Sequence, residues 1–226
     1  MLPTTKTKPK TDFLTTRTCI VGNPKVGKST FASELGEGVI FAATEQGLDF
    51  LSVYKSDINS YADFTKFVQA ITTTKHEFHT VVIDVMDKLI EMAEAQICAI
   101  NKVQFIKDIP YGAGYTATKR LILADLEKIS NAGLGLTLLT HAKEKEYKQE
   151  SISYTAMATS LPKSYEEPIL GLCDLILYCY IDASGKRMLR TKPNKYVLCA
   201  GDRSTKLPEK MEMNAKLVIE TLKQTK

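Results

Sequence analysis

The segment that most constrains the fold is GNPKVGKS, Gly22 to Ser29, which fits the pattern G-x-x-x-x-G-K-[ST] at every position. The apolar run TRTCIVG ends where this segment begins, and the helix-favouring run STFASEL follows it. A glycine-bearing turn between a strand and a helix lets successive backbone N–H groups curve around a phosphate, and the helix dipole adds its field. The sequence therefore predicts an α/β protein with a phosphate-binding loop, or P-loop, at its first strand–helix junction.

The loop residues have separate expected roles. Lys28 is expected to reach the β- and γ-phosphates of a bound nucleotide, and the Ser29 hydroxyl to ligate Mg²⁺. A glycine-bearing turn that binds nothing is the alternative, and the match of both pattern and context makes it the weaker one. The residues expected to bind the nucleotide are Gly22, Asn23, Pro24, Lys25, Val26, Gly27, Lys28, Ser29 and Thr30.

Strand-like and helix-like segments alternate along the rest of the chain. Near-continuous apolar runs separated by helices indicate a mostly parallel central sheet with helices on both faces. The short connection DASGK between the last two strands predicts an antiparallel C-terminal hairpin, and Pro208 is expected to begin a terminal helix. The predicted strands are 16–22, 38–44, 79–85, 135–141, 174–181 and 186–192, and the predicted helices include 64–72, 87–103 and 117–130.

Two stretches, 106–116 and 142–168, lack a regular pattern, and long loops in a compact domain are usually functional or disordered. The length of 226 residues favours one domain, which we expect over residues 15–226 behind a flexible basic segment, 1–14. That segment lacks the apolar core of a signal peptide, and no apolar run approaches the roughly 20 residues that span a bilayer. Five cysteines without a C-x-x-C pair indicate reduced thiols, so we expect a cytoplasmic protein that uses no membrane.

Polar side chains follow three predicted strands at their carboxyl ends, where ligands bind in open α/β sheets. Asp84 ends TVVID and suits the acid that holds the Mg²⁺ shell; a helix cap is the alternative, and Asp87 fits that role better. Glu45 follows FAAT, where it can orient and deprotonate the water that attacks the γ-phosphate; a solvated loop glutamate is the alternative. Thr140 and His141 end LTLLTH, where a loop histidine with satisfied hydrogen bonds is the alternative.

The order of these motifs resembles the ATPase core of RecA and RadA-type recombinases: a P-loop, a strand ending in ATEQGLD, then VVIDV, then LTLLTH before a long loop. The single-domain size and the segments IPYGAGY and AGDRSTKLP look most like the small phage-encoded nucleotide-binding proteins. Some of those proteins act in single-strand annealing and recombination. The resemblance covers about residues 15–210, its P-loop is the one highly specific motif, and it implies a RecA-like core that hydrolyses ATP with Mg²⁺.

The resemblance also implies roles for individual residues. Glu45 matches the family's water-activating glutamate and Asp84 its Mg²⁺ acid. His141, or alternatively Thr140, matches the polar sensor of the γ-phosphate. In the family this sensor precedes a mobile DNA-binding loop, which corresponds to residues 142–168 here. Residues 106–116 correspond to the other DNA-facing loop.

The segment GDRSTKLP resembles the K-x-R-x-G segment with which RadA- and helicase-type relatives reach the phosphate of a neighbouring subunit. Arg203 matches its arginine, which would act as a finger in trans and neutralise charge on the transferred phosphoryl group. Gly201 and Thr205 depart from the pattern, because such relatives often have Lys and Gly there. The alternatives for Arg203 are a surface arginine or an adenine-side contact within its own subunit.

Nucleic-acid binding needs separate support, because a P-loop does not imply it. Lysines in 142–168 alternate with glutamates, but three tyrosines there can stack on single-stranded bases: Tyr147, Tyr154 and Tyr165. The more basic candidate surrounds 106–116 and consists of Lys102, Lys107, Lys119 and Arg120 with Tyr111 and Tyr115. The alternative for both charge runs is a solvated face.

The expected function is an oligomeric, Mg²⁺-dependent ATPase whose ATP-bound form binds single-stranded DNA and acts in recombination, annealing or repair. ATP would lie at protomer interfaces of a ring or filament, and a single-strand-binding protein is a further candidate partner. Two other classes stay open: a P-loop phosphotransferase for nucleosides or nucleotides, and a nucleotide-gated loader for a replication protein. The phosphotransferase needs an arginine-rich lid, and 142–168 contains no arginine.

Overall fold

The computed structural model describes residues 2, 4–5, 12–149 and 152–224. Most of the predicted flexible segment 1–14 therefore lies outside the described residues. At its end, the short 3-10 helix η1 (Phe13–Thr15) contacts the C-terminal helix, and the Phe13 ring is buried there. The folded part of the chain thus begins no later than Phe13.

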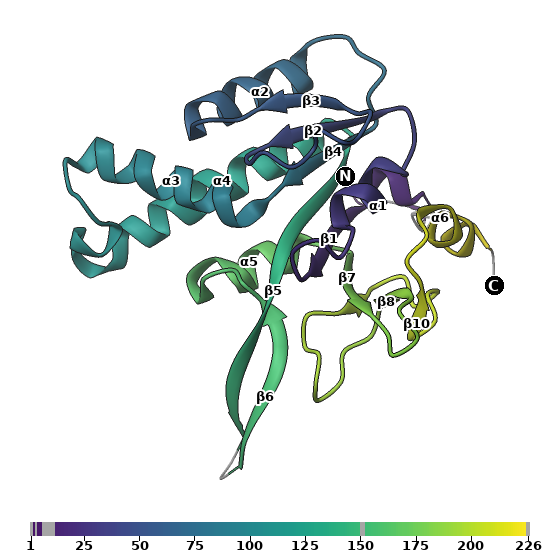
Figure 1. Ribbon diagram of the computed structural model, residues 1–226. Coiled ribbons are helices and arrows are strands. Elements are labelled where there is room, and N and C mark those ends of the chain that lie inside the picture. The colour runs from purple at the N-terminus through teal and green to yellow at the C-terminus, as the bar shows by residue number, and fades with distance from the viewer. Residues whose placement is uncertain (1, 3, 6–11, 150–151, 225–226) are drawn as a thin grey trace.

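The described strands form one sheet (Figure 1). Across it they run in the order β10 (Lys210–Glu212), β8 (Arg187–Arg190), β7 (Leu175–Ile181), β1 (Arg17–Gly22), β5 (Gly135–Gln149), β4 (Thr80–Asp84), β2 (Val39–Ala43) and β3 (Tyr54–Asp57). Neighbours from β7 to β3 are parallel, and β8 and β10 continue the sheet antiparallel. Two more strands pair off this path, β6 (Ile152–Thr159) with β5 and β9 (Gly201–Asp202) with β7. The predicted mostly parallel α/β fold and its antiparallel C-terminal hairpin are confirmed.

Helices cover both faces of the sheet. The helices of one face are α2 (Tyr61–Thr73), α3 (Met86–Asn101), α4 (Ala113–Asn131) and α5 (Lys163–Leu172), and those of the other are α1 (Lys28–Ser33) and α6 (Ala215–Lys223). Successive strand residues point to opposite faces, so on β1 Cys19 and Val21 join the first core while Ile20 joins the second. Both faces are thus buried, which explains the near-continuous apolar strands of the sequence.

The strand order brings the predicted site residues to one edge of the sheet. β5 lies between β1 and β4, with Gly22 beside His141, and β4 lies beside β2, with Ala43 beside Asp84. Because these strands are parallel, all their carboxyl ends meet at this edge. The loops that follow them converge there.

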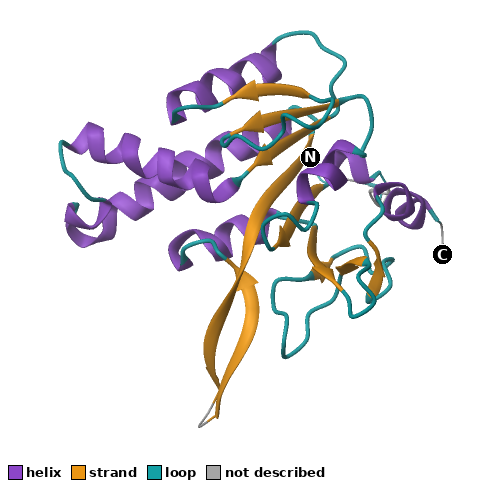
Figure 2. Cartoon of the chain, in the orientation of Figure 1, coloured by secondary structure: helices purple, strands orange, loops and turns teal. Residues whose placement is uncertain are grey.

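The prediction that 142–168 lacks regular structure is wrong. Residues 142–149 continue β5, which pairs antiparallel with β6, and the two strands project from the sheet as a long hairpin (Figure 2). Helix α5 covers residues 163–172. The charged and polar side chains of KEKEYKQ carry no apolar alternation, so pairing with the second strand decides the conformation.

Two further predictions of local structure are wrong. Residues 106–116 form the 3-10 helices η2 (Ile106–Asp108) and η3 (Pro110–Gly112) and the first turn of α4. Pro208 does not begin the terminal helix, because residues 210–212 pair with β8 as β10. The helix begins after Asn214, whose side chain accepts a hydrogen bond from the backbone N–H of Leu217.

Among the described residues, no helix combines the length and the apolar character needed to cross a membrane.

Candidate nucleotide-binding site

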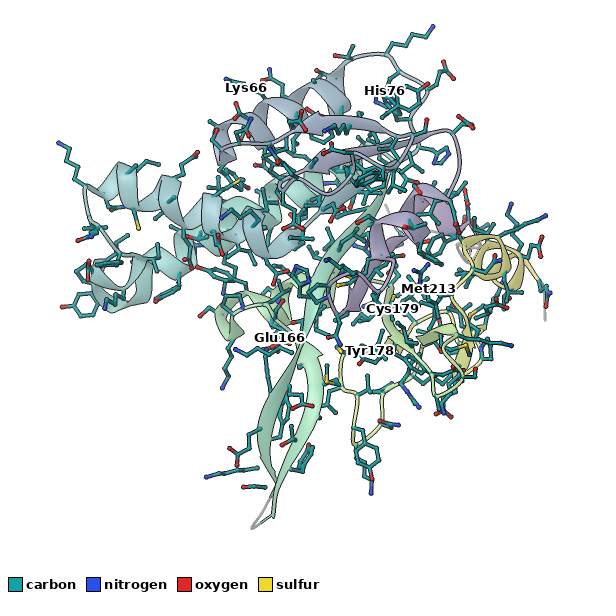
Figure 3. The ribbon with its side chains drawn as sticks, viewed as in Figure 1. Lys66, His76, Glu166, Tyr178, Cys179 and Met213 are labelled. Atoms are coloured by element: carbon teal, nitrogen blue, oxygen red, sulfur yellow. The ribbon has the colours of Figure 1, made fainter. Side chains whose placement is uncertain are left out.

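Two glycines give the P-loop its shape. A Cβ atom at Gly22 would lie 2.9 Å from the carbonyl oxygen of Cys179, which is labelled in Figure 3, and 2.9 Å from Val26 Cγ1. Gly27, the residue before α1, has φ of 104° in the left-handed region. The first glycine allows a close approach between β1 and β7, and the second a conformation that side chains disfavour. Together they turn the chain into α1 as the pattern requires.

Lys28 lies at the start of α1 and is buried. Its Nζ donates hydrogen bonds to the carbonyl oxygens of Gly22 at 2.9 Å and Asn23 at 3.1 Å, and lies 3.4 Å from His141 Nδ1. Burial lowers the pKa of Lys28. The ammonium is thus held against its own loop, beside the end of β5, at the position where phosphate oxygens replace such carbonyls in P-loop proteins.

Ser29 and Asp84 form the second element of the site. The Ser29 hydroxyl donates a 2.7 Å hydrogen bond to Asp84 Oδ2, and Asp84 is 5% exposed. Burial raises the pKa of Asp84, and the hydrogen bond from Ser29 and the charge of Lys28 act in the opposite direction. A hydroxyl and a carboxylate at this separation are hard oxygen ligands of the kind Mg²⁺ takes, so this pair fits that ion.

The loop after β2 is fixed to the end of β4 by Thr44. Its hydroxyl donates to the Val85 carbonyl at 2.9 Å and accepts from the Val85 N–H at 2.7 Å, and its own N–H donates to the Asp84 carbonyl at 2.8 Å. These bonds direct the next residue, Glu45, toward the same cavity as Asp84. The Glu45 carboxylate lies at the exposed side of that cavity.

One cavity of about 530 Å³ collects most of the predicted residues. Of the nine residues expected to bind nucleotide, six line it: Pro24, Lys25, Gly27, Lys28, Ser29 and Thr30. The predicted catalytic residues that line it are Lys28, Glu45, Asp84 and His141. Gly22, Asn23 and Val26 are outside this lining. A cavity bounded by backbone N–H groups of a helix start, an ammonium and two carboxylates suits a nucleotide with its metal ion.

Arg203 is not in this cavity. Its guanidinium donates to Asp174 Oδ1 at 2.8 Å, and Asp174 lies just before β7 and also binds Arg17 at the start of β1. These are the amino ends of the strands, at the opposite edge from the P-loop. An adenine-side contact in its own subunit does not fit this position, while the role in trans stays a prediction.

Six residues of the cavity lining were not predicted as site residues, and two of them, Arg187 and Phe50, have large side chains at the nucleotide position or its rim. Arg187, the first residue of β8, lines the cavity, and its guanidinium carbon lies 3.5 Å from the position of a Cβ atom at Gly27. Phe50 lies at the rim with its ring fully exposed. An aromatic residue in the polar loop just beyond ATEQGL was a signal for Phe50. The sequence contained no signal for Arg187. This residue reaches the P-loop because β8 pairs with β7, which lies beside β1, and that arrangement depends on the tertiary structure.

The predicted DNA-contacting tyrosines divide into two groups. Tyr147 and Tyr154 form a stacked pair on the hairpin, with ring centroids 5.8 Å apart. Tyr165 is fully buried on α5 and donates to Glu94 Oε1 at 2.6 Å, so the prediction that it stacks on bases is wrong. In the other segment Tyr111 is fully exposed, at the turn between α3 and α4.

Comparisons with known proteins agree with this geometry. A comparison with protein families matches residues 15–204 to the AAA domain. A search of curated proteins found no match. The matched range contains the P-loop, the ends of β2, β4 and β5 and most of the 226 residues. The chain therefore belongs to the AAA domain family of P-loop ATPases.

Proposed function

We propose that this ATPase is of the RecA-like recombination type: a Mg²⁺-dependent homo-oligomer whose ATP-bound form binds single-stranded DNA through the β5–β6 hairpin. One observation carries the proposal. Strand β5 runs without a break from the nucleotide cavity, where it places His141, into the projecting hairpin with its tyrosine pair. A single strand therefore connects the phosphate site to a surface suited to bases.

The residues of the cavity divide the work of hydrolysis. On nucleotide binding, Lys28 would exchange its loop carbonyls for phosphate oxygens, and Ser29 and Asp84 would hold Mg²⁺. When bound, this ion would supply positive charge next to the phosphates. Asp84 is engaged by Ser29, so Glu45 is the carboxylate of the cavity lining that is placed to orient water and accept its proton. His141, beside Lys28, senses whether the γ-phosphate is present.

The hairpin offers both charge and aromatic surface. Cross-strand partners share a face, so Lys143, Lys145, Tyr147 and Tyr154 lie on the same side of the hairpin. Lys145 is paired with Glu166 at 2.7 Å, whereas Lys143 is exposed on this side. Lys148 is exposed on the opposite side of the hairpin. Stacking on aromatic rings supplies roughly 1 to 3 kcal/mol per base without sequence preference. A lysine and tyrosine face therefore suits single-stranded DNA.

A groove beside the hairpin extends this surface. The segment after β8 pairs with β6, because the Met157 N–H donates to the Tyr196 carbonyl and the Leu198 N–H donates to the Met157 carbonyl. Between this segment and Tyr154 lies a cavity of about 580 Å³. Tyr196 is 61% exposed at its edge, with Lys195 Nζ 4.8 Å from the ring centroid. An aromatic ring beside an ammonium is the arrangement that stacks a base while attracting its phosphate.

The α3–α4 turn is a weaker DNA candidate, although Tyr111 and Phe105 are exposed there beside Lys107. Helix α3 begins at the nucleotide site and has 16 residues, which place its far end about 24 Å away at 1.5 Å per residue. The hairpin begins next to His141. If ATP binding is to change DNA affinity, the hairpin is therefore a better DNA-binding surface than the α3–α4 turn.

The test is binding of a fluorescein-labelled oligo-dT, measured by anisotropy at low salt with a non-hydrolysable ATP analogue and Mg²⁺. We expect single-stranded DNA to bind more tightly than duplex, and the affinity to fall with salt. Tyr154→Ser is expected to weaken binding about tenfold, as loss of one stacking contact predicts. Tyr111→Ser, which removes a fully exposed tyrosine on the α3–α4 turn, is the control.

Two results of this experiment would contradict the proposal, and further assays would then identify the alternative function. Equal loss in the Tyr111→Ser variant moves the DNA site to the α3–α4 turn. Absence of any single-stranded DNA binding by the ATP-loaded wild-type protein overturns the recombination-type function. Phosphate transfer to nucleosides, or capture of a replication protein without DNA, would then identify the phosphotransferase or the loader.

A further inference from the structure

The side chain of Asp87 connects the nucleotide site to the root of the hairpin. Asp87 lies in the first turn of α3, three residues after Asp84, and the sequence predicts that it caps this helix. That prediction is wrong, because Val85 is the capping residue and it makes no side-chain bond. The Asp87 carboxylate instead faces β5 and the end of β6.

Three donors from the hairpin root converge on this carboxylate. Oδ2 accepts from the Thr140 hydroxyl at 2.7 Å and from the His141 N–H at 3.3 Å, and Oδ1 accepts from the Ser160 hydroxyl. Thr140 is fully buried at the point where β5 leaves the sheet, and Ser160 is the first residue after β6. One carboxylate thus binds both strands where they leave the core.

The hydrogen bond between Asp87 and His141 lies next to Lys28, the residue expected to bind phosphate. His141, whose N–H binds Asp87, places Nδ1 3.4 Å from Lys28 Nζ. The Ser160 N–H donates to the His141 carbonyl at 2.8 Å, which ties β6 to the same residue. Movement of Lys28 or of Asp84 on nucleotide binding therefore reaches the two hairpin strands through Asp87 and His141.

A second helix also holds the hairpin root but has no link to the phosphate site. On α5, Glu166 accepts from Lys145 Nζ and from the Thr159 hydroxyl, both at 2.7 Å (Glu166 is labelled in Figure 3). The lining of the nucleotide cavity contains no residue of α5 among those the structure describes. Glu166 therefore supports the hairpin from α5, whereas Asp87 supports it from α3, the helix that begins two residues after Asp84.

We propose that Asp87 is a positioning residue that couples nucleotide occupancy to DNA affinity: it sets the direction of the hairpin relative to α3, so that ATP in the cavity and DNA on the hairpin favour the same arrangement. The inference rests on the proposed function, since it assumes that the hairpin binds single-stranded DNA. Coupling of this kind is reciprocal, because each ligand must change the affinity for the other by the same factor.

The experiment measures four dissociation constants for the full chain: oligo-dT with and without the ATP analogue, and a fluorescent ATP analogue with and without oligo-dT. In the wild-type protein we expect ATP to tighten DNA binding by a factor in the range of about 5 to 150. Asp87→Asn keeps the size of the side chain but loses its charge and part of its acceptor capacity, so this factor should approach one in both directions.

Glu166→Gln is the matched control. It weakens the same hairpin root, so it should lower DNA affinity equally with and without nucleotide and leave the coupling factor unchanged. Ser160→Ala, which removes one donor and retains the other two, should lower the coupling factor partially. It serves as the second variant if Asp87→Asn fails to fold.

The possible failures are distinguishable. If wild-type DNA binding responds to ATP and Asp87→Asn responds equally, Asp87 has no coupling role and the proposed function stands. If Glu166→Gln lowers the coupling factor as much as Asp87→Asn does, the effect is general loosening of the hairpin and the inference is overturned. Absence of DNA binding by the wild-type protein overturns the proposed function and, with it, the inference.

Discussion

At the scale of single residues, the two carboxylates of the nucleotide cavity differ in their surroundings. Asp84 is buried and accepts the Ser29 hydroxyl, whereas Glu45 lies at the exposed side of the cavity. A carboxylate engaged with a hydroxyl and a metal ion is a poor proton acceptor. This difference agrees with the separate roles predicted from the sequence, a Mg²⁺ ligand for Asp84 and a general base for Glu45.

Glu45→Gln is therefore expected to lower kcat for ATP hydrolysis by about 10²- to 10⁴-fold, the usual contribution of a general base. Affinity for ATP should stay close to that of the wild-type protein, because the phosphate-binding residues are untouched. Steady-state hydrolysis and titration with a fluorescent ATP analogue measure the two quantities. Glu37→Gln, an exposed glutamate outside the cavity lining, is the control, and an equal loss of affinity and rate in Glu45→Gln would contradict the assignment.

Substitutions of Arg187 and Arg203 are expected to differ in their effect on the affinity for ATP. Arg187 borders the P-loop in its own subunit, so Arg187→Ala should weaken ATP binding about tenfold, as expected for loss of a charged hydrogen bond. Arg203→Ala should leave this affinity unchanged, because Arg203 lies at the other edge of the sheet. Isothermal titration calorimetry with ATP and Mg²⁺ measures both, and the reverse order of effects would refute the placement.

At the scale of elements, Asp174 connects the amino ends of β1 and β7 to the carboxyl end of β9. Its carboxylate accepts from Arg17 Nη2 at 3.0 Å and from Arg203 Nη1 at 2.8 Å, and Arg203 donates its backbone N–H to the Asp174 carbonyl. Burial would raise the pKa of Asp174, but the hydrogen bonds and charge of Arg17 outweigh it and the pKa is lowered. This connection therefore stabilises the fold only while this carboxylate is ionised.

The pH dependence follows from this direction. A carboxyl whose native pKa lies below its unfolded value stabilises the fold above the unfolded pKa, and that stabilisation is lost as pH falls through the native pKa. Asp174→Asn should lower the free energy of unfolding by about 1 to 2 kcal/mol at pH 7, with the difference from the wild-type protein shrinking below about pH 4. Urea unfolding at several pH values measures this. Arg203→Ala, which removes the 60% exposed partner, should cost less, and a difference that is constant with pH would contradict the ionic origin.

At the scale of the whole molecule, the proposed oligomer places a neighbouring copy against the nucleotide cavity. In that arrangement the neighbouring copy would cover Phe50, which is fully exposed at the cavity rim. Arg203 lies at the opposite edge of the sheet and is paired with Asp174, so any contact it makes with a nucleotide would be with one bound to another copy.

Mixing Lys28→Ala protein with wild-type protein tests the arrangement. If sites are completed between copies and act together, activity should fall more steeply than the wild-type fraction as the inactive variant is added. The measurement is the steady-state ATPase rate at constant total protein, after exchange of subunits. A strictly linear decrease would mean that each chain hydrolyses ATP alone.

The sequence by itself determined the P-loop, the mostly parallel α/β class and the residues at the carboxyl ends of β2, β4 and β5, because these signals are local. A glycine spacing, an apolar run or an acid at a strand end has the same meaning wherever the chain goes. The short strands β3, β9 and β10 carry little such signal. They are strands because a neighbour pairs with them.

Only the tertiary structure decided which distant residues meet. Residues 142–159 read as an irregular loop, and cross-strand pairs such as Tyr147 with Tyr154 make them a hairpin. Arg187 reaches the P-loop, Arg203 is drawn to Asp174, and Asp87 binds the hairpin root, because strand order and register bring these elements together. Such contacts depend on the position of two segments at once, which the pattern of either segment alone does not contain.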